Sequence, residues 1–136
     1  MGTAARLGNM RSDLVAASVK IFAGALLMLN AAGYVTKGAT ATGSFGIGRA
    51  EARADNSAGA NGAITVSWCG GVFRFANSSA GDMITNARAG KLCTIVDDQT
   101  VAKTDGTATR SRAGIVDAVE ANGVWVRFDE AVTRAT

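Results

Sequence analysis

Residues 115–128 read Ile-Val-Asp-Ala-Val-Glu-Ala-Asn-Gly-Val-Trp-Val-Arg-Phe, with apolar and polar side chains alternating on both sides of an Asn-Gly pair. Asn-Gly is the preferred pair for a two-residue type I′ turn, because both residues tolerate a positive φ. A loop made of Asn122 and Gly123 pairs Ala121 with Val124 across the two strands. The stretch therefore predicts an antiparallel β-hairpin near the C-terminal end of the chain.

The alternation assigns the side chains of this hairpin to two faces. One face is mostly apolar and suits the core: Ile115, Val119, Val124, Val126 and Phe128, with Asp117 interrupting them. The other parity forms the opposite face: Val116, Ala118, Glu120, Trp125 and Arg127. On that face Trp125 can lie at a surface, with Arg127 stacked on it or on a partner. The alternative, which we favour, is that the monomer itself partly covers Trp125.

The rest of the chain from Val15 onward consists of short apolar runs cut by Gly, Asn and Asp. With 17 glycines and no proline, the turns must be formed by Gly, Asn and Asp. This pattern predicts an all-β fold, a small β-sandwich or β-barrel of short antiparallel strands. Strands are expected within residues 15–22, 25–29, 45–53, 63–68, 72–76, 91–96 and 100–103. Loops are expected at residues 36–44 and 54–62, whereas residues 82–89 form either a strand or a helical turn.

The strand expected at residues 45–53 has two unlike faces. Phe45, Ile47 and Arg49 share one parity, and the other parity holds only glycine and alanine. A face of such small residues lets another backbone or another subunit approach closely.

The N-terminal part divides into an arm and the start of the β-rich region. Residues 1–13 show no sustained period and are expected to form a flexible arm, which is either simply disordered or orders on a partner, followed by a single β-rich domain at 14–136. The apolar run at residues 21–29 is only nine residues long, too short to span a bilayer. We interpret the segment 14–35 as buried strands, with a signal peptide as the alternative.

The composition excludes several classes of activity. The chain has no histidine, which removes Ser-His-Asp and Cys-His catalysis and His-ligated zinc. Of the 136 residues, 27 are alanine, so the core is thin and we expect the protein to gain stability from partners. We therefore expect a binding or structural protein, no enzyme and no cofactor.

Charged residues and cysteines have ordinary structural explanations. The net charge of +3 is scattered, which favours a solvated mixed-charge surface over a nucleic-acid or membrane surface. Asp97, Asp98 and Asp105 are interpreted as turn residues rather than as metal ligands. Cys69 and Cys93 are interpreted as buried free thiols, with a cross-strand disulfide as the alternative.

Four segments carry a resemblance to a known group of proteins. They are Gly71-Val72-Phe73-Arg74-Phe75-Ala76-Asn77, residues 90–101, Arg112-Ala113-Gly114-Ile115-Val116-Asp117, and Gly123-Val124-Trp125-Val126. Together they resemble the head-decoration or structural-cement proteins of tailed bacteriophages, over about residues 15–130.

The resemblance implies a protein made in the host cytoplasm that binds the exterior of the phage capsid and cements neighbouring major capsid protein subunits. It implies association with further copies of the chain, with a trimer favoured, and no direct contact with nucleic acid or membrane. Candidate capsid-contact residues are Arg6, Arg11, Trp125 and Arg127. The rival hypotheses are a phage head fibre or host-surface adhesin domain, and a carboxylate-dependent hydrolase.

Overall fold

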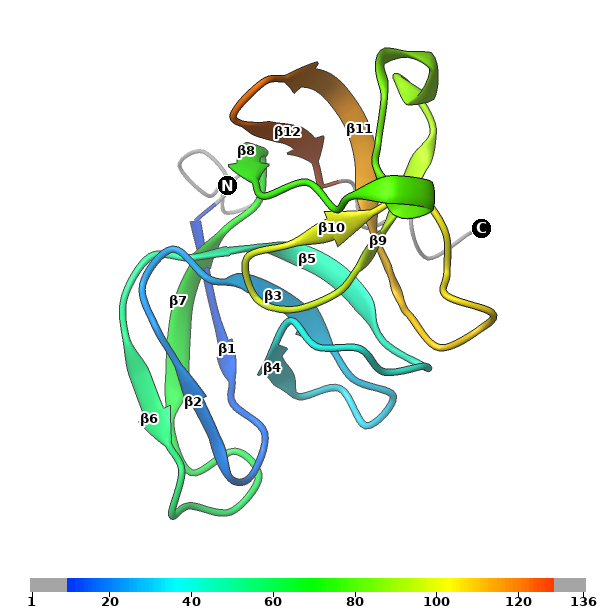
Figure 1. Ribbon diagram of the computed structural model, residues 1–136. Coiled ribbons are helices and arrows are strands. Elements are labelled where there is room, and N and C mark those ends of the chain that lie inside the picture. The colour runs from blue at the N-terminus through cyan, green and yellow to red at the C-terminus, as the bar shows by residue number, and fades with distance from the viewer. Residues whose placement is uncertain (1–9, 129–136) are drawn as a thin grey trace, which may run out of the picture.

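The computed structural model describes residues 10–128, and their regular structure is almost all β-strand (Figure 1). The strands are β1 (Met10–Leu14), β2 (Val19–Ile21), β3 (Leu26–Leu29), β4 (Val35–Lys37), β5 (Phe45–Ala50), β6 (Ala54–Asn56), β7 (Thr65–Cys69), β8 (Val72–Phe75), β9 (Leu92–Ile95), β10 (Val101–Ala102), β11 (Arg112–Glu120) and β12 (Gly123–Arg127). Two single-turn 3-10 helices, η1 (Ala80–Asp82) and η2 (Asn86–Arg88), lie in the region where the sequence left a strand or a helical turn open. The prediction of an all-β fold is confirmed.

The strands form one ten-stranded sheet and a separate pair, β2 with β6. The main path through the large sheet is β1-β7-β5-β11-β12-β8, and β3, β4, β9 and β10 branch from it. Neighbouring strands are antiparallel except at the β5–β11 contact, which is parallel. Because the path ends at β1 on one side and β8 on the other, the sheet does not close into a barrel.

Strand β3 divides the interior into two cores, because it is buried on both faces. Leu26 and Met28 pack into the core that lies among β8, β9, β11 and β12. Leu27 packs into the second core, which lies among β2, β4, β5 and β7. The period-two alternation of a strand sends successive side chains to opposite sides. The unbroken apolar run at residues 21–29 is thereby explained: part of it is a strand buried on both faces.

The small residues of β5 contact other parts of the same chain. A Cβ atom built on Gly46 would clash with the carbonyl oxygen of Ala113 on β11, and one on Gly48 would clash with the carbonyl oxygen of Cys69 on β7. The expectation of a close backbone approach is therefore confirmed at both glycines, by β11 at Gly46 and by β7 at Gly48. A register shift sets Gly46 opposite Met28 and Gly48 opposite Leu27 of β3, so the two glycines do not share one face.

The C-terminal hairpin forms as predicted, but in a different register. Glu120 pairs with Gly123 and Val119 with Val124, so the two loop residues are 121–122 rather than 122–123. Gly123 belongs to β12 because β8 runs directly beside it. A Cβ on Gly123 would lie 2.8 Å from the carbonyl oxygen of Phe75. The predicted pairing of Ala121 with Val124 is thus wrong by one residue.

A β-bulge at Asp117 changes which side chains of β11 face the core. Val116 pairs with Val126, whereas Ala118 pairs with Trp125, so Asp117 is an extra, exposed residue in β11. An extra residue reverses the inside–outside parity on one side of it. Val116 is therefore buried in the core with Val124, and Ile115 lies opposite Arg127 on the other face. The predicted face of Val116 is wrong for this reason, whereas Ile115 is buried as predicted, although it lies opposite Arg127.

The expected loop at 54–62 begins with a strand that a buried asparagine stabilises. Ala54 and Asn56 of β6 are buried, whereas Asp55 between them is exposed. The Nδ2 of Asn56 donates hydrogen bonds to the carbonyl oxygens of Ala16 and Ala60, both at 2.9 Å. Asn56 thus occupies a buried strand position at which the alternation pattern leads one to expect an apolar side chain, so the pattern predicts a loop.

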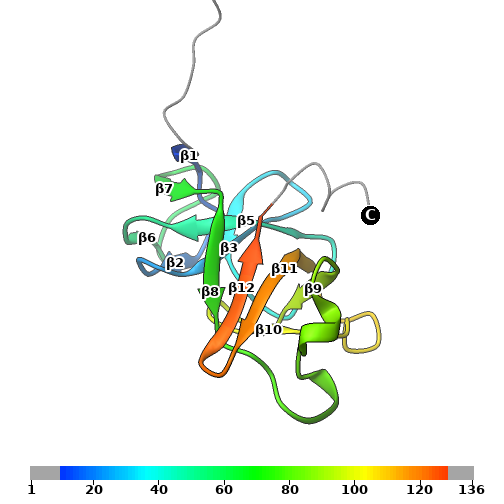
Figure 2. The same ribbon diagram turned by 90° about the horizontal axis from the view of Figure 1, so that it is seen from above.

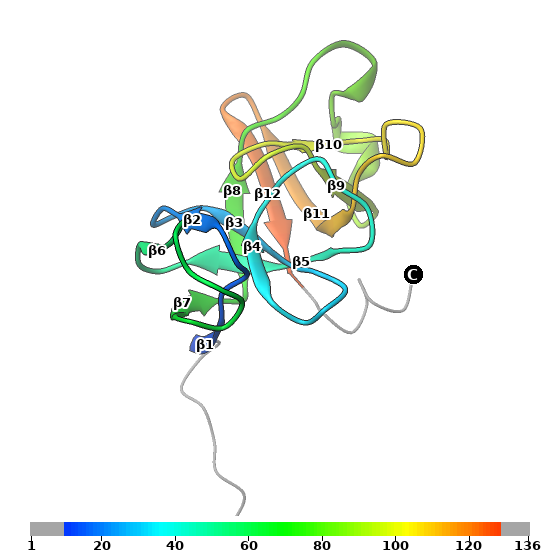
Figure 3. The same ribbon diagram turned by 90° about the horizontal axis from the view of Figure 1, so that it is seen from below.

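Residues 10–13, which the sequence analysis assigns to the arm, form most of β1. This strand pairs with β7 over its whole length, from Met10 opposite Cys69 to Leu14 opposite Thr65. Views from above and below place β1 at the outer edge of the ribbon, beyond β7 (Figures 2 and 3). The remainder of the arm, including Arg6, lies outside the described residues.

Candidate contact surface

A shallow pocket of about 330 Å³ lies at the corner where the chain passes from β7 to β8. Its lining comes from five strands and the corner itself: Arg11, Ile47, Trp68, Gly70, Gly71, Val72, Arg127 and Phe128. Gly71 makes the corner with a φ of 136°, and its carbonyl oxygen accepts a hydrogen bond from the Phe128 N–H at 2.9 Å. These glycines let β7 and β8 separate, so the pocket opens between two strands that are adjacent in sequence.

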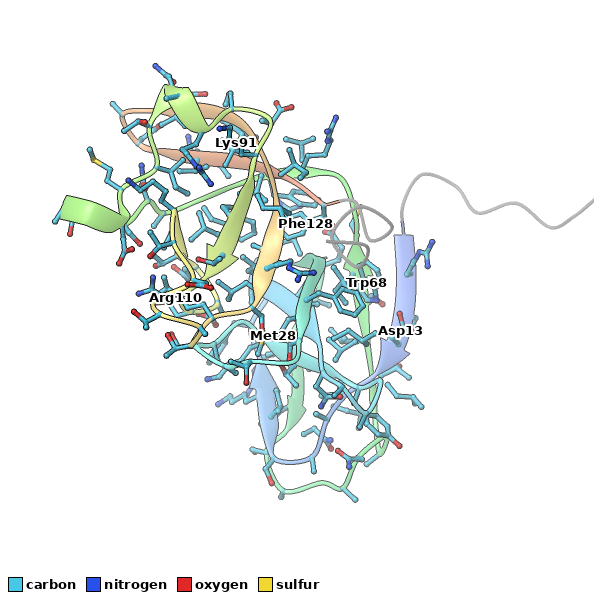
Figure 4. The ribbon with its side chains drawn as sticks, turned by 90° about the vertical axis from the view of Figure 1, so that its right-hand side faces the viewer. Asp13, Met28, Trp68, Lys91, Arg110 and Phe128 are labelled. Atoms are coloured by element: carbon cyan, nitrogen blue, oxygen red, sulfur yellow. The ribbon has the colours of Figure 1, made fainter. Side chains whose placement is uncertain are left out.

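Trp68 forms one wall of this pocket and is fixed by β1. Its side chain is buried, and its indole Nε1 donates a hydrogen bond to Oδ2 of Asp13 at 2.8 Å (Figure 4). The guanidinium carbon of Arg11 lies 5.8 Å from the centroid of the Trp68 ring, which is cation–π distance. Two charged residues of one strand therefore fix a single indole ring and hold β1 to β7.

The outer face of β8 and β12 continues the surface beyond the pocket. Trp125 lies opposite Arg74, and Arg127 lies opposite Val72, so the four side chains form two adjacent cross-strand pairs. Val72 is one of the few large apolar side chains in the described residues that is exposed, at 39%. We call these four residues together with Arg11 the arginine face.

Trp125 is half-buried, as the favoured interpretation of the sequence expects. Its indole Nε1 donates a hydrogen bond to Oε1 of Glu120 across the hairpin. The cation nearest its ring is Arg74, whose guanidinium carbon lies 5.9 Å from the ring centroid. Arg127, which the sequence suggested as the stacking partner, instead lines the pocket. Arg74 takes the stacking position because the strand register puts it directly opposite Trp125.

Three of the four candidate contact residues thus lie on one surface. Arg11 and Arg127 line the same pocket although they are far apart in sequence, and Trp125 is two residues from Arg127 on the same face. Arg6 is outside the described residues. Arg74 belongs to the same surface and was not among the predicted contact residues, although alternation along residues 72–75 puts Arg74 and Val72 on one face.

The polar groups that line the pocket determine the chemistry it can perform. Its two charged side chains are guanidiniums, which donate hydrogen bonds in a planar fork. A guanidinium binds carboxylates or phosphates, and it does not serve as a nucleophile or a proton acceptor at neutral pH. The arrangement is therefore suited to contact with an anionic group beside an apolar side chain.

Two acidic side chains, Asp97 and Asp82, have structural roles, and Asp97 is one of the three that the sequence analysis considered as metal ligands. Oδ1 of Asp97 accepts a hydrogen bond from the Gln99 N–H at 2.8 Å, which is the turn chemistry that the sequence predicts. Asp82 contacts Arg110 at 3.3 Å and accepts a hydrogen bond from the Thr104 hydroxyl, which lowers the pKa of the Asp82 carboxyl. No group of three or more Cys, Asp or Glu side chains placed to hold a metal ion occurs within residues 10–128.

Both cysteines are free thiols, so the alternative of a disulfide between them is not realised. Cys93 is buried, and burial raises the pKa of its thiol to about 12. Cys69 is only partly buried, and its Sγ lies 3.1 Å from the carbonyl oxygen of Gly70.

No protein-family model, no curated protein and no solved structure matches this chain. Among the described residues, no helix is long and apolar enough to cross a membrane.

Proposed function

We propose that this protein is a virion structural protein of a tailed bacteriophage. It binds the outer surface of the capsid and cements neighbouring major capsid protein subunits. The observation that carries the proposal is the arginine face, in which exposed Arg127 and Val72 adjoin half-buried Trp125. The resemblance of four sequence segments to head-decoration proteins supplies the identity of the partner.

The arginine face has the composition of a protein-binding surface. Arginine and tryptophan are the residue types most often found among the few that dominate binding energy at protein interfaces. The pocket beside them is walled by Trp68 and Phe128 and can receive one side chain of the partner. Its arginine side chains match carboxylates of an acidic capsid surface, through paired hydrogen bonds.

The interior of the protein is consistent with a role in an assembly. Its apolar residues are divided between two small cores, so each core buries little surface on its own. Binding to a capsid stabilises such a fold by mass action, and many weakly bound copies jointly stiffen the shell. We place the protein on the capsid exterior after synthesis in the host cytoplasm, and a homo-oligomer, with a trimer favoured, is what the resemblance implies.

Binding to capsids is the experiment that tests this function. Purified protein is mixed with expanded capsids assembled without it, and the bound copies and the heat resistance of the capsids are measured. We expect saturable, stoichiometric binding and a higher disruption temperature. Arg127→Glu should weaken binding by about 30-fold or more, as expected for loss of a dominant interface arginine. Lys91→Glu, which reverses an exposed charge elsewhere, is the matched control and should bind normally.

Two outcomes of this experiment refute the proposal. The first is an absence of stoichiometric binding by the folded wild-type protein, with no gain in capsid heat resistance. The second is equal binding by the Arg127 and Lys91 variants, which would separate capsid binding from the arginine face. Removal of residues 1–9, which leaves β1 whole, tests Arg6 and the arm: weaker binding assigns them to the contact.

The pocket also favours one alternative function, an adhesin domain of a head fibre or of the virion surface. Two guanidiniums beside the aromatic walls of Trp68 and Phe128 suit a sugar that bears a carboxylate. Binding of the isolated protein to acidic glycans, lost in Arg127→Glu and accompanied by no capsid binding, would select this alternative.

A further inference from the structure

Strand β1 is an open edge of the large sheet. Among the described residues its only strand neighbour is β7, and it is the last strand on the sheet path. All four side chains from Arg11 to Leu14 are exposed, and Leu14 retains 47% of its surface. Figures 2 and 3 show no other strand beyond it. An unpaired edge of this kind is a template for pairing with another strand.

The hydrogen bonds around Val15 show which backbone groups of β1 face outward. The Val15 N–H donates to the carbonyl oxygen of Ile64 at 3.0 Å, on the β7 side. Because backbone groups alternate along a strand, those of residues 11 and 13 also face β7, and those of residues 10, 12 and 14 face away. The next outward donor, the Ala16 N–H, bonds the carbonyl oxygen of Val35 at 2.9 Å. Within residues 10–128, the open edge therefore consists of the five residues of β1.

The sequence of β1, Met-Arg-Ser-Asp-Leu, is complementary to itself when it is reversed. If two copies pair antiparallel about a two-fold axis at Ser12, Arg11 of each copy lies opposite Asp13 of the other. The remaining positions place the residue types Met and Leu opposite each other. Centring the pairing on residue 11 or on residue 13 would instead put like charges opposite each other. The register centred on Ser12 is also the one that aligns all five open positions of both copies.

The contacts with Trp68 restrict the positions of the Arg11 and Asp13 side chains before the two copies pair. The indole hydrogen bond uses Oδ2 of Asp13, and the Arg11 guanidinium lies over the ring at 5.8 Å. Both side chains are thereby held on one face of the strand, where Oδ1 of Asp13 is the remaining carboxylate oxygen. In the two-fold pairing, positions 11 and 13 form a non-hydrogen-bonded pair, in which opposed side chains are closest.

We propose that two copies of this chain associate through antiparallel pairing of their β1 strands, so that the sheet continues across a two-fold axis. The outward groups of residues 10, 12 and 14 form the hydrogen bonds, and the two Arg11–Asp13 pairs set the register. This interface is isologous, since the same patch is used by both copies. It does not rest on the proposed function, and a two-fold dimer is an alternative to the trimer that the resemblance implies. In such a dimer Arg11 belongs to the contact between copies and is removed from the capsid-binding part of the arginine face, where Arg127, Trp125, Arg74 and Val72 remain.

Charge reversal at the two positions tests the pairing by sedimentation or by light scattering after size exclusion. The wild type should be a concentration-dependent dimer. Arg11→Asp places Asp opposite Asp, and Asp13→Arg places Arg opposite Arg, so each single variant should be a monomer. An equimolar mixture of the two single variants should form a heterodimer, because each then offers the charges that the other lacks. The double variant R11D/D13R should dimerise again.

The controls separate loss of pairing from loss of folding. Lys91→Asp changes the net charge equally at a position far from β1 and should leave the dimer intact (Figure 4). Near-ultraviolet circular dichroism must show that each single variant keeps its tryptophan environment. If it does and the mixture stays monomeric, the proposal is refuted. A wild type that is a trimer, or a monomer up to about 1 mM, where only very weak pairing would escape detection, refutes it as well.

Hydrogen exchange of the wild type gives a test that needs no variant. The Ser12 and Leu14 amides face outward, so their protection should rise with protein concentration as dimers form. The Asp13 amide faces β7 and should be protected at all concentrations. Protection of Ser12 that does not depend on concentration would contradict the proposed pairing.

Discussion

Gly46→Ala is the substitution for which the structure predicts the clearest loss of stability. Gly46 lies in β5, and a Cβ atom there would lie 2.9 Å from Cα of Ala113 and closer still to its carbonyl oxygen. The obstructing atoms are backbone atoms of β11, so no side-chain rotation can relieve the contact. The two strands would have to separate until the carbonyl oxygen of Ala113, the closest of these atoms, reached the ordinary contact distance of 3.4 Å.

The magnitude follows from two opposing effects. Adding a methyl group to a filled interior destabilises a protein by about 1–3 kcal/mol. The upper half of that range applies to Gly46→Ala because the backbone of β11 must move. Replacing glycine by alanine also restricts the unfolded chain, which stabilises the native state by about 0.4–1 kcal/mol. The net loss in the free energy of unfolding is about 2 kcal/mol. With a typical urea slope, the midpoint of unfolding should fall by about 1 M.

The matched control is Gly81→Ala in η1. A Cβ on Gly81 has nothing within 4 Å, so only the effect on the unfolded chain remains. We expect this variant to be as stable as the wild type or slightly more stable, within about 0.5 kcal/mol. Urea unfolding followed by tryptophan fluorescence compares the three proteins. Equal midpoints for the Gly46 and Gly81 variants would refute the conclusion that β11 packs directly on β5.

Three further predictions concern buried and titratable groups. Asn56→Ala removes the amide that donates hydrogen bonds to the carbonyl oxygens of Ala16 and Ala60 and leaves both without that donor. The free energy of unfolding, measured with urea, should therefore fall by about 2–4 kcal/mol. The pKa of Asp82 in the folded protein lies below its usual value of 3.8, mainly because the Thr104 hydroxyl donates a hydrogen bond to the carboxylate. The ionised Asp82 therefore stabilises the folded state above the unfolded pKa, and this stabilisation is lost as the pH falls through the lower folded pKa. Asp82→Asn should therefore make stability fall less steeply in acid, as measured by urea unfolding from about pH 5 to pH 2. At pH 8 a thiol reagent should modify Cys69 of the native protein quickly and Cys93 only on unfolding, because burial raises the pKa of Cys93 to about 12.

The positions of most strands follow from local alternation, which is why the sequence predicts them. The register of the C-terminal hairpin does not follow in the same way. The Asn122-Gly123 pair favours a turn at those residues, but the backbone of β8 requires a residue without a side chain beside Phe75. Gly123 satisfies that tertiary contact, and the turn moves one residue toward the N-terminus.

The bulge at Asp117 was visible in the sequence only as an interruption. A charged residue at a position of core parity can mean a buried charge, a strand end or an extra residue. The structure realises the last, with Asp117 exposed and Val116 buried beside it. A single sequence cannot separate these cases, because the choice depends on which strand lies across from β11.

The residues of the contact surface are also only partly predictable from local sequence, because some of them are far apart in the chain. Alternation alone places Trp125 and Arg127 on one face, and this part of the prediction is confirmed. The meeting of Arg11 with Arg127 depends on the β7–β8 corner and on the pairing of β1 with β7, which join residues at opposite ends of the chain. Arg11 could not be assigned to a strand from sequence, because its neighbours show no period and the strand is exposed on both faces.

The small residues of β5 and the charged residues of β1 lead to opposite conclusions about where other copies bind. Small residues suit close approach by either an internal strand or a second subunit, and in this protein β11 already lies against Gly46 and β7 against Gly48. These two positions are therefore closed to partners. The open edge is β1, where exposed arginine and aspartate oppose non-specific strand pairing. Their reversed order about Ser12 turns the same two charges into a specific match for one partner only, a second copy of the chain. Alternating opposite charges along an edge can thus exclude other strands and still select an identical one.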